Sequence, residues 1–219
     1  MLELDIRGRD YARPVLGAIQ AGIAAGDRIC LLGPSGIGKT TLLKAIAGLD
    51  SSLPERAIVR HRPARIGYLF QEHRLLPWRT LKANIELVGV SAAEAESCLA
   101  RVGLAPYADY LPDQLSLGMA RRAALARCLA VRPDLLLLDE PFASLDPVMA
   151  GELKTLIRGV LDASPDMAMI CVTHDGHDAE TLANRLWYLD GRPARLQWDR
   201  PMDDPGGLEQ LLGKLRTPL

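Results

Sequence analysis

The stretch from Gly33 to Thr41, which reads GPSGIGKTT, constrains this chain more than any other. It fits the phosphate-loop pattern, in which a glycine and four variable residues precede Gly-Lys-Ser/Thr. An apolar run at 29–32 comes before it and a helix-forming run at 42–47 comes after it. Because backbone N–H groups of such a loop and the following helix N-terminus hold phosphates, the sequence predicts a nucleotide site.

Individual loop residues have expected parts in this site. Lys39 is expected to reach the β- and γ-phosphates, and the Thr40 hydroxyl to ligate Mg²⁺. A glycine turn that matches by chance is the alternative, but the flanking strand and helix favour nucleotide binding. The predicted nucleotide-binding residues of the loop are Gly33, Pro34, Ser35, Gly36, Ile37, Gly38, Lys39, Thr40 and Thr41.

The composition excludes several classes of protein. The 219 residues suffice for one α/β domain, with or without a small subdomain, and a net charge of -1 gives no basic footprint for nucleic acid. No apolar run approaches about 18 residues, and the acidic start lacks a basic region, so neither a membrane span nor a signal peptide is predicted. Reduced, buried thiols are expected at Cys30, Cys98, Cys128 and Cys171.

Hydrophobic periodicity predicts an α/β arrangement. Two early alternating runs suggest an antiparallel flap, and all-apolar runs suggest central strands buried on both faces. The expected strands span 2–6, 15–23, 29–32, 57–60, 65–70, 135–138, 167–172, 185–190 and 195–198.

Capping signals predict helices in the middle of the chain. Ser91 and Glu94 have capping-box spacing, and Gly103 is expected to end that helix. A further run at 120–130 ends before Pro133. We expect a single domain over 1–219, with a core and flap at 1–79 and 131–219 and a helical subdomain at about 80–130.

Polar residues follow three of the predicted parallel strands, where ligands bind in open α/β sheets. They are Gln71, the pair Asp139 and Glu140, and His174. Two carboxylates at the end of a buried strand are costly without a cation, so Asp139 is expected to bind Mg²⁺, directly or through water. Glu140 is then expected to orient and polarise an attacking water. A surface acidic turn is the alternative.

Tyr11 lies about 28 residues before Lys39. Its ring could stack on adenine, or it could lie half-buried at a sheet edge, and the spacing alone leaves both open.

Together, these motifs resemble the ATP-binding subunits of ABC transporters, in the family's order and over nearly the whole chain. Gln71 matches the Q-loop, 115–119 (LSLGM) the signature, 144–146 the D-loop and His174 the switch histidine. The resemblance implies a P-loop NTPase core of α/β class with a mainly parallel sheet, an N-terminal antiparallel β flap and an inserted α-helical subdomain. The family also has an aromatic residue where Tyr11 falls, which favours adenine stacking.

The resemblance also implies a mechanism. Two copies would pair head to tail as a homodimer, with each ATP between one copy's phosphate loop and the other's signature. Ser116 and the Gly118 N–H would contact the γ-phosphate at a helix N-terminus. The implied catalytic residues are Glu140, His174 and Gln71. Tyr11, Ser116, Gly118 and Asp146 would add to the nucleotide site, and Thr40, Gln71 and Asp139 to the Mg²⁺ site.

The implied partners are an integral membrane permease and a periplasmic or extracellular solute-binding protein, with no nucleic acid. The chain would be cytoplasmic, on the inner face of the cell membrane. The segment 70–78 (FQEHRLLPW) resembles importer subunits for nitrate, alkanesulfonates and taurine. Within it, the run from Leu75 to Trp78 would form a groove for a permease helix, or else pack inside the helical block.

Two questions stay open at this level. The alternative function is an ABC-type ATPase of an export, lipoprotein-release or cell-division complex; a small-molecule kinase would leave Ser116 and His174 unexplained. Leu117 replaces the first glycine of the family's LSGGQ signature. If that position needs a positive φ, the leucine is strained, and we expect weaker ATP-driven closure.

Overall fold

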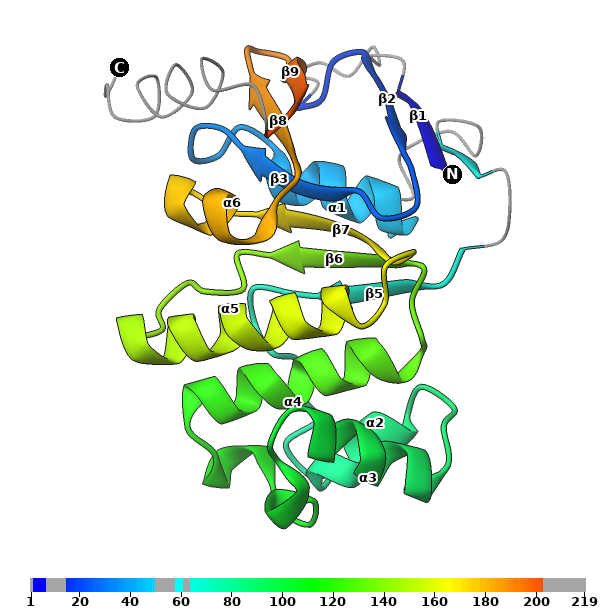
Figure 1. Cartoon of the computed structure of the whole chain (residues 1–219), viewed down its shortest axis with the longest axis vertical. Helices are drawn as coiled ribbons and strands as arrows, with labels where there is room; N and C mark the ends of the chain where they lie inside the picture. Colours follow the sequence, from blue (N-terminus) through cyan, green and yellow to red (C-terminus); the bar gives the residue numbers. More distant parts are fainter. Residues whose placement is uncertain (1, 7–14, 50–57, 61–63, 203–219) are drawn as a thin grey trace. The chain divides into compact units, whose positions relative to one another are not determined.

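The computed structural model describes residues 2–6, 15–49, 58–60 and 64–202. The chain divides into two compact units, one formed by Met1–Ala64 with Pro165–Leu219 and the other by Arg65–Ser164. Figure 1 shows the elements of each unit. The boundaries predicted for the helical subdomain, at about 80 and 130, stay a prediction.

The first unit contains a small antiparallel sheet. Its strands β1 (Leu2–Ile6), β2 (Ile19–Ile23) and β4 (Ile58–Arg60) pair in the order β2-β1-β4. The expected antiparallel flap at the N-terminus is therefore confirmed. The second strand is shorter than the alternating run 15–23, because the chain at Leu16 instead forms a parallel bridge to Ala194.

A larger set of strands in the same unit surrounds β3 (Arg28–Leu32). It pairs in parallel with β7 (Ala168–Val172) on one side and with β8 (Arg185–Asp190) on the other (Figure 1). An antiparallel strand, β9 (Arg195–Pro201), follows β8. Helix α1 (Lys39–Ala47) follows β3, and α6 (Gly176–Leu182) follows β7. The buried patterns of β3 and β7 confirm the prediction of central, all-apolar strands.

The second unit joins one parallel strand pair to a helical block. Strands β5 (Ile66–Leu69) and β6 (Leu135–Asp139) pair in parallel, and every residue of β6 is buried. Together with the pairs around β3, this confirms the predicted mainly parallel sheet. The helices of this unit are α2 (Leu81–Glu86), α3 (Ala92–Arg101), α4 (Leu117–Ala130) and α5 (Pro147–Asp162), with 3₁₀ turns at Ala105–Tyr107 and Pro112–Gln114.

Side chains cap the starts of two helices, and the first cap is the one that the sequence predicts. Ser91 and Glu94 make a reciprocal capping box at the start of α3. The Asp146 carboxylate accepts hydrogen bonds from the N–H groups of Val148 and Met149, both at 3.0 Å, and so begins α5. These bonds satisfy N–H groups that a helix leaves unpaired at its start.

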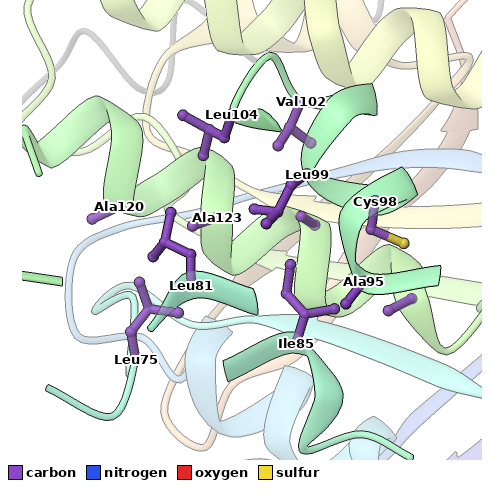
Figure 2. Close-up of a cluster of buried hydrophobic side chains, with 12 residues drawn as sticks. Leu75, Leu81, Ile85, Ala95, Cys98, Leu99, Val102, Leu104, Ala120 and Ala123 are labelled. Carbon is purple, nitrogen blue, oxygen red and sulfur yellow. The ribbon is translucent and has the colours of Figure 1, made fainter. Parts of the chain in front are cut away.

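The helical block has its own hydrophobic cluster (Figure 2). Leu81 and Ile85 of α2 face Leu99 of α3 and the small residues Ala120 and Ala123 of α4. Small side chains on α4 allow the other helices to approach closely. This cluster packs α4, along its length from Ala120 to Ala130, against α2 and α3.

All four cysteines are buried and free, as predicted. Among the residues that the structure describes, no helix has the length and apolar character needed to cross a membrane.

Candidate functional site

The phosphate loop leaves β3 through a conformation that only glycine adopts easily. Gly33 has φ 153°, and a Cβ there would collide with the backbone oxygen of Leu189. Gly38 has φ 109° and is the N-cap of α1, and its Cβ would lie 2.9 Å from Val15 Cγ1. Both glycines are therefore required by positive φ and by close neighbours.

Lys39 is folded into this loop. Its side chain is buried, and Nζ donates to the carbonyl oxygens of Gly33 (2.8 Å) and Pro34 (2.9 Å). Beside Gly36, which has φ 72°, a Cβ would meet no described atom within 4 Å, so the loop is open on that side. Gly38 supplies no side-chain acceptor to the first turn of α1, whose N–H groups suit an anion. The loop therefore fits nucleotide phosphates.

His174 lies on the same edge of the first unit as this loop. Strands β3 and β7 are parallel neighbours, with Leu31 opposite Val172, so the loop and His174 both follow carboxyl ends. The turn at His174 is fixed by buried Thr173, whose hydroxyl donates to Asp178 and accepts the Asp175 N–H at 3.0 Å. The imidazole itself is exposed, so it can reach a ligand.

The acid pair stands at the end of β6 in the second unit. Asp139 is 2% exposed, and its Oδ2 accepts a hydrogen bond of 3.1 Å from the Tyr68 hydroxyl. Burial, reinforced by the Asp139 carboxylate, raises the pKa of Tyr68 above its ordinary value, so the phenol keeps its proton and donates. Glu140 is partly exposed and has φ 48°, an uncommon backbone for a residue with a side chain.

Gln71 is exposed and follows β5, the neighbour of β6. Because Leu69 pairs with Leu138, Gln71 and the acid pair leave the same edge of this unit. The chain around Gln71 is held by α4: Arg121 donates to the Phe70 oxygen at 3.0 Å. Arg127 donates to the carbonyl oxygens of the next turn, those of His73 (3.0 Å) and Arg74 (2.8 Å).

The signature segment begins α4. Ser116 is the N-cap, and its Oγ accepts the Met119 N–H at 3.2 Å. Leu117 is the first helical residue and 43% exposed. Its backbone is helical, so the condition for strain, a positive φ, is not met. Strain was expected only under that condition and so does not arise here, and the weaker ATP-driven closure stays a prediction.

The starts of α4 and α5 share a pocket of about 200 Å³. A Cβ on Gly118 would lie 3.0 Å from Met149 Sδ, so the glycine allows the two helix starts to approach. Around the pocket, Leu117, Val148 and Met149 expose apolar surface. The pocket is lined by Ser116, Gly118, Arg122, Leu145, Asp146, Val148, Met149, Glu152 and Leu153.

The sequence left open whether the apolar run after Gln71 packs inside the helical block or forms a surface groove, and its residues differ in this respect. Leu75 is 6% exposed and belongs to the helical cluster, as Figure 2 shows. Trp78 is 71% exposed. Tyr11 lies outside the described residues.

Three kinds of site residue escaped sequence reasoning. Val15 packs against Gly38 and stays 52% exposed beside the phosphate loop. Tyr68 reaches Asp139 from a strand 71 residues earlier. Arg121 and Arg127 look like ordinary helix-surface cations in the sequence. None of these contacts left a local signal in the sequence, because each joins residues that are far apart in the chain.

Comparison with known proteins agrees with this geometry. Residues 16–143 match the ABC transporter family. The Aliphatic sulfonates import ATP-binding protein SsuB 3 of Paraburkholderia xenovorans (strain LB400) is 47% identical over 217 residues, 96% of this chain and 86% of the relative. SsuB 2 of Burkholderia cenocepacia (strain HI2424) is 40% identical over 213 residues, 93% of this chain and 78% of the relative.

The fold is also similar to solved structures. A dimeric post-hydrolysis state of the ATP-binding cassette MJ0796, bound to ADP and Pi, superposes with a TM-score of 0.76 at 25% identity. That match covers 92% of this chain and 99% of the cassette. This chain belongs to the ABC transporter family. It is an ATP-binding subunit of that family and an ATPase.

Proposed function

We propose that this chain hydrolyses ATP to drive the import of aliphatic sulfonates through a membrane permease. One observation carries the choice of solute class: relatives named for aliphatic sulfonate import are 47% and 40% identical over more than nine-tenths of the chain. The same names support import over an export, lipoprotein-release or cell-division role.

The phosphate loop binds the nucleotide in this proposal. Lys39 exchanges its bonds to the loop carbonyls for the β- and γ-phosphates, which the open side of the loop admits. Thr40, Gln71 and Asp139 would hold Mg²⁺, which would neutralise phosphate charge when bound. The donor set of hydroxyl, amide and carboxylate oxygens suits that cation.

Glu140 is the proposed general base that orients the attacking water, and His174 holds the γ-phosphate. The partial exposure of Glu140 at the end of a buried strand supports this role, because its carboxylate can meet water while its backbone stays fixed. Tyr11 stacks on the adenine ring.

A second copy of the chain completes each site. The pocket at the starts of α4 and α5 presents Ser116, Gly118 and Asp146 beside exposed apolar side chains, which suits contact with the ATP-loaded phosphate loop of the partner. The solved MJ0796 cassettes of similar fold are dimers, which supports this arrangement. The homodimer forms head to tail.

The membrane permease is the proposed partner of the helical block, and Trp78, 71% exposed just after Gln71, is the proposed contact. The chain works on the cytoplasmic face of the membrane. A periplasmic or extracellular solute-binding protein delivers the sulfonate in the same system.

A gene deletion tests the solute and the chemistry together. A strain that lacks this gene should fail to grow on an alkanesulfonate as the only sulfur source and should still grow on sulfate. The wild-type gene should restore growth, and Glu140→Gln should not. In purified protein, Glu140→Gln should lower phosphate release from ATP about 100-fold or more. Normal growth of the deletion strain on sulfonates would contradict the proposed solute class.

A further inference from the structure

We propose that Tyr68 is a positioning residue that orients the Asp139 carboxylate toward its cation and links that carboxylate to the Gln71 segment. The proposal rests on the cation role of Asp139 given above. It is carried by the 3.1 Å hydrogen bond between Tyr68 Oη and Asp139 Oδ2.

Strand register explains why a tyrosine at this position reaches the acid. In the parallel pair β5–β6, Tyr68 is opposite Leu137. Asp139 lies two residues beyond Leu137, and because side chains alternate along a strand, it points to the same face. The Tyr68 side chain is long enough for its hydroxyl to reach past Leu137 to the Asp139 carboxylate.

The phenol cannot swing freely, because its ring is stacked. The Phe70 ring lies 4.1 Å from the Tyr68 ring, centroid to centroid, with the planes 22° apart. On Phe70, in turn, sits the Arg74 guanidinium, 3.9 Å from the ring centroid. Such aromatic and cation–π contacts restrict side-chain rotation. The hydroxyl is therefore held where Asp139 can use it.

The stack is also tied to the signature helix. Arg121 is 4% exposed and donates to the Phe70 carbonyl oxygen at 3.0 Å. Gln71 follows directly in the chain. Phe70 therefore joins the Tyr68 phenol, through its ring, to α4 and to the start of the Gln71 segment, through its backbone.

The hydrogen bond from the phenol restricts how the Asp139 carboxylate is oriented. An ionised carboxylate offers about four lone-pair positions, and the phenol uses one of them on Oδ2. The bond restricts rotation of the carboxylate without neutralising its charge. Outer partners of this kind, when removed, typically lower metal affinity about 10- to 100-fold.

The test uses Mn²⁺ as the probe, with affinity measured by electron paramagnetic resonance on the full chain with ADP bound. Tyr68→Phe keeps the ring and its stack and removes the hydroxyl. We expect Mn²⁺ affinity to fall about tenfold, at the lower end of the range for such partners. Affinity for ADP in EDTA should not change, whereas a general structural defect would lower both.

Matched variants separate the possible causes. Tyr107→Phe removes a hydroxyl from another tyrosine of the same unit, which packs edge-on against Tyr110 at 5.2 Å, and should leave Mn²⁺ affinity unchanged. Phe70→Leu keeps the Tyr68 hydroxyl but removes its stack, and should give a smaller loss than Tyr68→Phe. Tyr68→Met replaces Tyr68→Phe if the latter does not fold, and should give the same loss.

Asp139→Asn distinguishes failure of this inference from failure of the proposed cation site. If Asp139→Asn leaves Mn²⁺ affinity unchanged, the assignment of Asp139 is wrong and the inference falls with it. If Asp139→Asn weakens Mn²⁺ binding and Tyr68→Phe does not, the cation site stands and the role of Tyr68 is overturned.

Discussion

At the scale of single residues, Asn84 shows how much a buried polar side chain can organise. It is fully buried in α2, and its Oδ1 accepts the Leu76 N–H at 2.7 Å. Its Nδ2, which carries two hydrogens, lies 3.0–3.1 Å from three carbonyl oxygens, those of Leu76, Arg79 and Thr80, and the two hydrogens are shared among them. One side chain therefore fixes the turn that presents Trp78, the proposed permease contact.

Asn84→Ala should destabilise the protein strongly, because it removes the acceptor of the Leu76 N–H and the side-chain donor to the Arg79 carbonyl oxygen. We expect a loss of about 3 kcal/mol, the upper end of the range for an unsatisfied buried group. Urea unfolding followed by circular dichroism measures it. Lys82→Ala, on the same helix and paired with Glu96 on the surface, should change the midpoint little. Equal losses for the two variants would contradict this role.

His73 makes stability depend on pH. Burial, followed by the nearby guanidiniums of Arg121 and Arg127, lowers the pKa of His73 below its ordinary value, with Glu72 opposing. Its Nδ1 also accepts the Leu75 N–H at 3.2 Å, which requires that nitrogen to be unprotonated.

The sign of the effect follows from proton linkage. Between the lowered folded pKa and the unfolded value near 6.5, the unfolded chain binds more protons, so stability falls as pH drops through this window. His73→Gln should lose less stability than wild type between pH 7.5 and 5.5. Unfolding midpoints measured across that range check this. A parallel fall in both proteins would show that His73 is not responsible.

At the scale of elements, each helix cap involves only neighbouring residues, so its contribution to the free energy of unfolding can be predicted by itself. Ser91→Ala removes the acceptor at the start of α3 and should cost about 1 kcal/mol. Ser91→Asp keeps an acceptor and should recover most of that loss, and chemical unfolding of the three proteins measures the difference. If Ser91→Asp is as unstable as Ser91→Ala, the cap bond contributes nothing.

Elements that depend on neighbours in sequence were predictable, and contacts between elements were not. The buried run before Asp139 and the cap at Ser91 depend on residues within a few positions, so pattern and propensity identify them. The bond from Tyr68 to Asp139 joins two strands whose register no local pattern sets. The same is true of Arg121, whose partner Phe70 is 51 residues away.

The apolar run after Gln71 shows a second limit. It has no period of 2 or 3.6, so hydrophobicity alone could not separate Leu75, which enters the core, from Trp78, which stays exposed. Contacts with other elements separate them: Leu75 packs in the helical cluster, and Asn84 bonds the backbone of Leu76, which lies between the two residues. For a related reason, the sequence could not decide whether Leu117 has the positive φ that would strain it, because this φ depends on where α4 begins.

At the scale of the whole molecule, Leu117 bears on how two copies meet. Its side chain is 43% exposed beside the pocket at the starts of α4 and α5. Because it projects where the partner's phosphates are proposed to lie, Leu117→Gly should strengthen the ATP-driven dimer. Light scattering with ATP, in a Glu140→Gln background, measures this. Leu117→Ala controls for the lower helix propensity of glycine, about 1 kcal/mol. No gain in either variant would contradict a steric effect.

The central claim is that each ATP is held by the phosphate loop of one copy and the signature of another, and a mixing experiment tests it most directly. Lys39→Ala disables the loop and Ser116→Arg disables the signature, so each variant alone should release little phosphate from ATP. When the two are mixed, heterodimers contain one site in which both motifs are intact, and hydrolysis should recover to a clear fraction of the wild-type rate. A mixture that stays as inactive as either variant alone would contradict the shared site.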